Sequence, residues 1–169
     1  MIGLSTLIPI LIRRMEITDL EEVSQLDQQS FSLPWPESSF IFEIEKNEVS
    51  RCWVAETRDE RGDTHLVGMI VVWFIVDEVH IATLAVHPDM RKQKVAQRLL
   101  AHTLMDAFHS GAKKSFLEVR KGNLAARSLY HKFGFIYVGI RKAYYQNNGE
   151  DAVMMNLERF EIDKLESFL

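Results

Sequence analysis

The chain has 169 residues, of which 47% are hydrophobic and 26% charged, and its formal net charge is −4. This length suits one domain spanning residues 1–169, and the composition excludes a disordered chain. The acidic balance argues against direct binding to nucleic acid, and the single cysteine, Cys52, excludes an internal disulfide. The six histidines show no ligand spacing with carboxylates, so we expect no metal site.

The chain begins with a short apolar lead that lacks the features of a secretion signal. Its charges, Arg13 and Arg14, follow the apolar run, and Pro9 interrupts it. The run is also too short to cross a bilayer. We therefore expect a cytoplasmic protein without membrane contact, whose core covers about residues 8–157 and begins with a strand at Ile8–Arg13.

Two helices are predicted after this strand. Thr18 can cap the first, and Glu21 three residues later completes a capping box; the apolar stripe is Leu20, Val23 and Leu26. The Pro-rich segment Ser32–Ser39 ends this helix, and a second helix begins near Glu37.

Alternating apolar residues then predict three strands, at Arg51–Thr57, His65–Ile75 and Glu78–Val86, of which the last two form an antiparallel pair. Cys52 lies in the first of these strands, so a buried strand residue is expected there rather than a nucleophile.

A basic loop connects the strand that ends at Val86 to the next helix. It contains Arg91, Lys92 and Lys94, and from Lys92 onward the apolar residues recur at helical spacing until Gly111. A strand that passes through a cationic loop into a helix can hold a pyrophosphate without a metal, because the free N–H groups and the helix dipole face the anion. This segment points to an enzyme that binds a phosphorylated cofactor.

The last third of the chain adds a strand, a helix and a strand pair. Ser115–Val119 is the strand, and Asn123 caps a helix that Gly134 stops, with an apolar stripe of Leu124, Leu129, Tyr130 and Phe133. Phe135–Gln146 and Ala152–Leu157 are the final strands. The tail, Glu158–Leu169, is expected to form a helical turn or two.

The order of these elements predicts the fold class. It is α/β of the mixed α+β kind, with helices on both faces of a mixed sheet.

Two residues in the last third of the chain, Glu118 and Tyr130, could take part in catalysis, and each also fits a purely structural role. Glu118 fits a solvated strand position between inward-facing Leu117 and Val119, or a general base beside a ligand. Tyr130 fits a core tyrosine, but it lies two helical turns after Asn123, so both could touch one elongated ligand.

Three further aromatic residues are candidates for a binding surface. Tyr144 and Tyr145 lie near the end of a strand, where packing is the commoner role, although a tyrosine pair can line a pocket rim. Trp35, between two prolines, fits a binding loop and a surface plug equally well.

The motifs LAVHPDMRKQKVAQRLL and LEVRKGNLAARSLYHKFGF together resemble the GNAT superfamily of acetyl-CoA-dependent N-acetyltransferases. With FSLPW and the late AYYQ and GEDAVMM, the chain is similar to the bacterial RimI type, which acetylates N-terminal alanine of ribosomal proteins. The resemblance covers about Ile12 to Leu157. It implies the GNAT fold, a mostly antiparallel sheet of about seven strands with helices on both faces.

The resemblance also implies residue roles. Glu118 would be the general base and Tyr130 the general acid, while Trp35, Tyr144 and Tyr145 would face the amine substrate. The acetyl-CoA contacts would come from the strand, the loop and the helix cap: Leu84, Ala85, Val86, Arg91, Lys92, Gln93, Lys94, Val95, Ala96, Gln97 and Asn123.

One position departs from the family pattern. The first glycine of the usual pyrophosphate loop is replaced by Lys94. If the backbone there needs a positive φ, lysine costs about 1 kcal/mol or more. If it is right-handed, the ammonium adds attraction to phosphate.

The implied mechanism is direct transfer of the acetyl group to a protein N-terminus, possibly that of a ribosomal protein, without an acyl-enzyme. Two alternatives stay open. One is a GNAT enzyme that acetylates a small amine, a lysine side chain or an antibiotic. The other is an acyl-CoA-binding module without catalysis.

Overall fold

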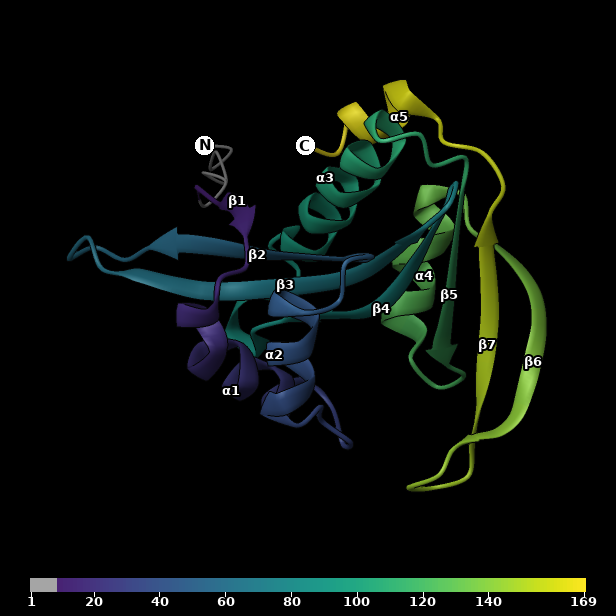
Figure 1. The fold of residues 1–169 in the computed structure, drawn as a ribbon, viewed down its shortest axis with the longest axis horizontal. Coiled ribbons are helices and arrows are strands. Elements are labelled where there is room, and N and C mark those ends of the chain that lie inside the picture. The colour runs from purple at the N-terminus through teal and green to yellow at the C-terminus, as the bar shows by residue number, and fades with distance from the viewer. Residues whose placement is uncertain (1–8) are drawn as a thin grey trace, which may run out of the picture.

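The computed structural model describes residues 9–169, and in that part of the chain seven strands form one sheet in the order β1-β2-β3-β4-β5-β7-β6 (Figure 1). Neighbouring strands are antiparallel except β4 and β5, which are parallel. The strands are β1 Leu11–Arg14, β2 Ser50–Arg58, β3 Thr64–Ile75, β4 Glu78–Val86, β5 Lys114–Arg120, β6 Ile136–Tyr145 and β7 Glu150–Leu157.

Helices pack on both faces of this sheet, as Figure 1 shows. The α-helices are α1 Leu20–Ser30, α2 Glu37–Glu45, α3 Val95–His109, α4 Leu124–Phe133 and α5 Ile162–Glu166, with short 3-10 turns at Ile17–Asp19 (η1) and Pro88–Met90 (η2). The predicted fold class, a mixed sheet with helices on both faces, is confirmed.

Each face of the sheet has its own hydrophobic core. On one face α1 and α2 bury Val23, Leu26 and Phe40 against Val54 and Met69. On the other face α3, α4 and α5 pack over the sheet, with Leu99, Leu104, Phe133, Met155 and Leu165 all buried. Because Leu165 is 1% exposed, the core continues past residue 157, where the predicted core ended.

Most predicted elements have the predicted type, with ends that differ by a few residues. The first strand runs from Leu11 to Arg14, and Ile8 lies outside the described residues. The helix after the basic loop begins at Val95 rather than near Lys92, because Lys92 and Lys94 both have positive φ. Cys52 is buried in β2, as predicted.

Two local predictions were wrong. Thr18 does not cap α1, because it lies inside η1; the capping box there is formed by Glu16 and Asp19, and Arg13 pairs with the Asp19 carboxylate at 2.7 Å. Leu124 does not join the buried stripe of α4. It is 69% exposed because it stands at the first helical position, beyond the edge of the core.

Candidate active site

The site begins where the parallel pairing between β4 and β5 stops. Those strands pair from Glu78 opposite Lys114 to Ile81 opposite Leu117, and no farther. In the β3–β4 ladder, Val72 lies opposite Ile81 and Val71 opposite Thr83, so Ala82 is an extra residue in β4. Such a β-bulge bends the strand that carries it. The bend therefore coincides with the point where β4 leaves β5.

Beyond this bulge the two strands no longer pair, and the region between their unpaired ends is called here the β4–β5 opening. Leu84, Ala85 and Val86 lie on its β4 side and still pair with β3. Ala85 is buried, whereas Leu84 and Val86 are half-buried. Because β5 does not pair with them, their backbone groups on that side can bind an extended ligand in the manner of a strand.

The basic loop lies between β4 and α3. Arg91, Lys92, Gln93 and Lys94 are all solvent-accessible, while Val95 is 1% exposed and points into the core. Only the backbone of Val95 can therefore reach a ligand. Ala96 and Gln97 continue the first turn of α3, where Gln97 accepts a hydrogen bond from Lys132 of α4.

Lys94 occupies the N-cap position of α3 with φ 64° and ψ 12°, a left-handed conformation. The positive φ confirms the first of the two alternatives for this position: lysine is strained here, whereas glycine would not be. Lys92 has the same φ of 64°. Alternating left-handed residues before a helix turn successive N–H groups toward one concave side, an arrangement that binds anions.

Gly68 of β3 lets α3 lie close to the sheet at this end. A Cβ atom at Gly68 would come within 2.8 Å of Leu99 Cδ1 and 2.9 Å of Val95 Cγ1. Because Gly68 lies opposite Val86, the same contact sets the position of the helix start relative to the β4–β5 opening.

Glu118 stands one residue after the last β4–β5 pair, at the apex of the opening. Its neighbours Leu117 and Val119 are buried in the core shared with α3 and α4, so Glu118 faces the opposite side of the sheet. Its side chain is 35% exposed, and Oε1 lies 3.2 Å from Arg141 Nη2 of β6. A partly exposed carboxylate beside the opening can accept a proton from a bound amine.

Tyr130 lies on α4 in the core of that face and is 6% exposed, with its ring centroid 5.6 Å from that of Phe135. Burial raises the pKa of Tyr130 well above its usual value, and the nearby phenol of Tyr145 adds to that increase. Asn123 caps α4 as predicted, because its Oδ1 accepts a hydrogen bond from Ala126 N at 3.1 Å.

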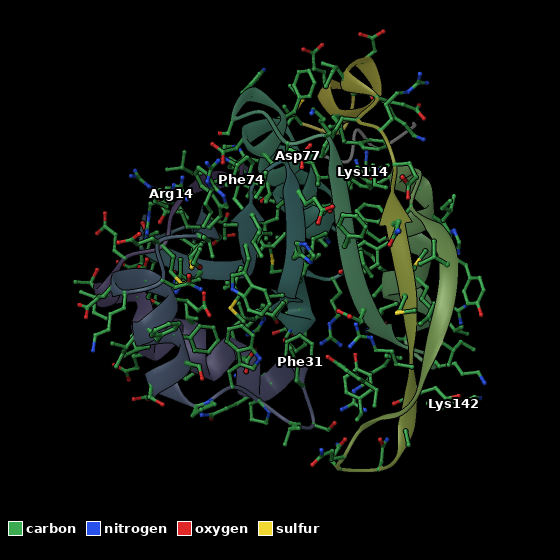
Figure 2. All side chains as sticks on the ribbon, turned by 45° about the vertical axis from the view of Figure 1, so that its right-hand side comes forward. Arg14, Phe31, Phe74, Asp77, Lys114 and Lys142 are labelled. Carbon is green, nitrogen blue, oxygen red and sulfur yellow. The ribbon has the colours of Figure 1, made fainter. Side chains whose placement is uncertain are left out.

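The predicted amine-side residues come from two separate segments. Tyr144 and Tyr145 end β6, and their rings meet edge to face at 5.2 Å. Trp35 belongs to the α1–α2 loop (31–36), where its backbone N–H donates to Asp27 Oδ2 at 2.6 Å and its ring packs on Phe40. The turn between β6 and β7 curls below the end of β5 toward this loop in both views (Figures 1 and 2).

Sequence reasoning did not identify two arginines of this region. Arg141 contacts Glu118, and Arg120 contacts the β6–β7 turn. The sequence around each arginine does not indicate these contacts, because each partner lies more than twenty residues away in the chain. Arg120 does follow Glu118 by two residues, and strand alternation places both on one face.

Within residues 9–169, no group of three or more His, Cys, Asp or Glu side chains is arranged to hold a metal ion. In the same part of the chain, no helix is long and apolar enough to cross a membrane.

This chain belongs to the acetyltransferase (GNAT) family, whose model matches residues 20–135. The protein is therefore an N-acetyltransferase, and acetyl-CoA is its acetyl donor. The β4–β5 opening and the basic loop between β4 and α3 are the parts of this fold that suit such a donor.

Its relatives include bacterial enzymes of one activity. It is 30% identical over 148 residues to the ribosomal protein bS18-alanine N-acetyltransferase of Escherichia coli (strain K12), covering 86% of this chain and 95% of that protein. It is 35% identical over 144 residues to a Bacillus subtilis (strain 168) protein provisionally assigned the same activity, covering 85% and 92%. The crystal structure of the Escherichia coli ribosomal-protein-S18-alanine N-acetyltransferase superposes with a TM-score of 0.79 at 28% identity, covering 90% of this chain and 95% of that one.

Proposed function

We propose that this enzyme acetylates the N-terminal α-amine of a ribosomal protein that begins with alanine. The observation that carries this proposal is the extent of similarity to the bS18-alanine N-acetyltransferases. It spans 85–86% of the chain, farther than the family match over residues 20–135. The additional length supports a shared amine substrate as well as a shared cofactor.

In this proposal acetyl-CoA lies in the β4–β5 opening. Its pantetheine amides pair with Leu84, Ala85 and Val86, and its pyrophosphate binds the loop from Arg91 to Gln97. Asn123 contacts the cofactor from the start of α4. The amine substrate enters from the side of Trp35, Tyr144 and Tyr145.

The proposed chemistry is direct attack. Glu118, through a water molecule, removes a proton from the amine as its nitrogen bonds to the thioester carbonyl carbon. A backbone N–H near Val86 stabilises the oxyanion. The carbon–sulfur bond then breaks, and Tyr130 donates its proton to the CoA thiolate.

Peptides that differ only in their first residue test this proposal. With acetyl-CoA and wild-type enzyme, we expect the peptide that begins with alanine to be acetylated fastest, with the acetyl group on the α-amine by mass mapping. The matched control is the same peptide with a blocked α-amine and an internal lysine, which should stay unmodified. Acetylation of that lysine alone would contradict the proposal, and absence of turnover on every α-amine would contradict it as well.

A further inference from the structure

The proposed reaction gives no role to Arg120, the last residue of β5. Its side chain nevertheless contacts four residues on the amine side. Its Nη1 lies 3.0 Å from Glu150 Oε2 and 3.3 Å from Asn148 Oδ1, and its Nη2 lies 3.0 Å from Asn147 Oδ1. The guanidinium also stacks 3.8 Å from the ring centroid of Tyr145. All four partners belong to β6, β7 or the turn between them.

These contacts continue in two directions. Glu150 Oε1 accepts a hydrogen bond from Gly122 N at 2.8 Å, in the turn that leads from β5 into α4. Asn147 Nδ2 donates to Ser32 Oγ at 3.1 Å, in the α1–α2 loop. Asn147 and Ser32 are 115 residues apart in the chain, so this hydrogen bond joins the two segments that carry the amine-side residues.

We propose that Arg120 is a positioning residue for the amine substrate: it holds the β6–β7 turn in place and, through Asn147 and Ser32, fixes that turn against the α1–α2 loop. The two segments then form one preorganised wall beside Glu118. This inference rests on the proposed function only in taking that wall to receive the amine.

The chemistry of arginine explains why this residue type stands here. A guanidinium presents several N–H donors in one plane, so it can bind a carboxylate and two amide oxygens while its face lies on an aromatic ring. The Arg120 and Glu150 side chains are only 21% and 24% exposed, so water screens their ion pair less than at an open surface. A lysine at this position carries one compact ammonium and could keep only part of these contacts.

Arg120 is separated in role from the reacting atoms. No contact of Arg120 involves Glu118 or Tyr130, whereas Glu118 pairs with Arg141. Loss of the Arg120 contacts should therefore weaken binding of the amine and leave the chemical step of the bound complex largely intact. A residue needed only for folding would instead affect both substrates and thermal stability together.

The test compares Arg120→Lys with a matched control in the same hairpin. Lys142 of β6, labelled in Figure 2, makes a 2.9 Å ion pair with Asp151, and its side chain is 76% exposed. In the full-length enzyme we expect Arg120→Lys to raise KM for the alanine-first peptide about tenfold, with kcat changed less than about threefold. The dissociation constant for acetyl-CoA should not change. Lys142→Ala should resemble the wild type in all three values.

A double-mutant cycle tests the link between the two segments. Ser32→Ala should raise the peptide KM, and Asn147→Ala should raise it further because it also removes the contact with Arg120. The double variant should be no worse than Asn147→Ala alone, because the hydrogen bond to Ser32 is already lost there. Independent, additive effects would overturn the proposed link.

Hydrogen exchange without any amine separates this inference from the proposed function. Arg120→Lys should speed amide exchange at residues 145–150 and 31–36 while the core strands stay protected. If the wild type acetylates no α-amine, the proposed function fails, and this measurement still reports on the wall. Unchanged exchange at these segments, or an unchanged peptide KM, would overturn the role assigned to Arg120.

Discussion

Glu118 occupies a strand position that faces away from the core, as alternation predicted, and its role as general base stays a proposal. Alternation with Leu117 and Val119 predicted a residue that faces away from the core, and the structure places it so, at 35% exposure. The end of β4–β5 pairing at Leu117 is what turns this ordinary strand position into the apex of an opening. No sequence pattern around Glu118 contains that information, because it depends on where β4 bends.

Replacing Glu118 with glutamine tests its assigned role. Glu118→Gln keeps the shape of the side chain but removes the base, so turnover should fall by about two to four orders of magnitude with acetyl-CoA affinity nearly unchanged. The residual rate should rise with pH, since more of the amine is then unprotonated without help. Steady-state rates between pH 6 and 10 and a cofactor titration measure both effects; a wild-type rate would exclude Glu118 as the base.

Tyr130 gives a second prediction, on kcat and on its pH dependence. Tyr130→Phe keeps the buried ring but removes the acidic proton, so kcat should fall about a hundredfold while the thermal unfolding temperature stays close to the wild type. Because burial raises the pKa of Tyr130, its protonated form persists to higher pH than that of an exposed tyrosine. The wild-type rate should therefore not fall through loss of this proton near pH 10, which a kcat–pH profile would show directly.

At the scale of elements, local signals predicted structure wherever the residue concerned acts within its own helix. Asn123 caps α4, and Gly111 and Gly134 have φ of 98° and 96° after α3 and α4, as their positions indicated. The prediction failed at Thr18, where Arg13 and Asp19 arrange the first turn through a contact with β1. Local signals also did not predict the contact of Arg120 with the β6–β7 turn or that of Arg141 with Glu118.

The cofactor loop provides a prediction at this scale. Lys94→Gly removes a left-handed lysine, a gain of about 1–2 kcal/mol that is offset by about 0.5–1 kcal/mol of added freedom in the unfolded chain. The free energy of unfolding should thus rise slightly. Acetyl-CoA affinity should stay within about tenfold, or ~1.4 kcal/mol, because in the proposed binding mode backbone N–H groups make most of the phosphate contacts.

Denaturant unfolding and calorimetric titration measure these two quantities, and Lys92→Gly is the matched comparison because Lys92 has the same φ. A loss of affinity far beyond tenfold in Lys94→Gly alone would show that its ammonium holds the phosphate.

For the whole molecule, the sequence predicted the class of the fold and the two-faced sheet, because the spacing of apolar residues reports which side each element buries. The resemblance placed Trp35, Tyr144 and Tyr145 together on a proposed amine side. It did not predict the hydrogen bond between Ser32 and Asn147 that joins the α1–α2 loop to the β6–β7 turn, because that contact has no counterpart in local sequence.

Acetyl-CoA binding should be independent of metal ions. The loop offers cations and backbone N–H groups, and the described residues 9–169 hold no cluster of metal-ligating side chains. Calorimetric titration with acetyl-CoA in buffer containing a chelator should give the same dissociation constant as titration without it. A marked loss of affinity in the chelator would contradict the proposed binding mode.

Because of the bulge at Ala82, the β4–β5 opening depends more on the number of residues in β4 than on which residues they are. Before it Val79 and Ile81 belong to the α3 core, and after it Ala85 belongs to the α1–α2 core, so the extra residue shifts the alternation by one. Deleting Ala82 would leave Thr83 opposite Val71 and the later residues of β4 on their present faces, but it would remove the bulge and with it the bend away from β5. Relatives that diverge widely in sequence can therefore keep the opening through many substitutions, whereas a single deletion at this point should abolish acetyl-CoA binding in one step.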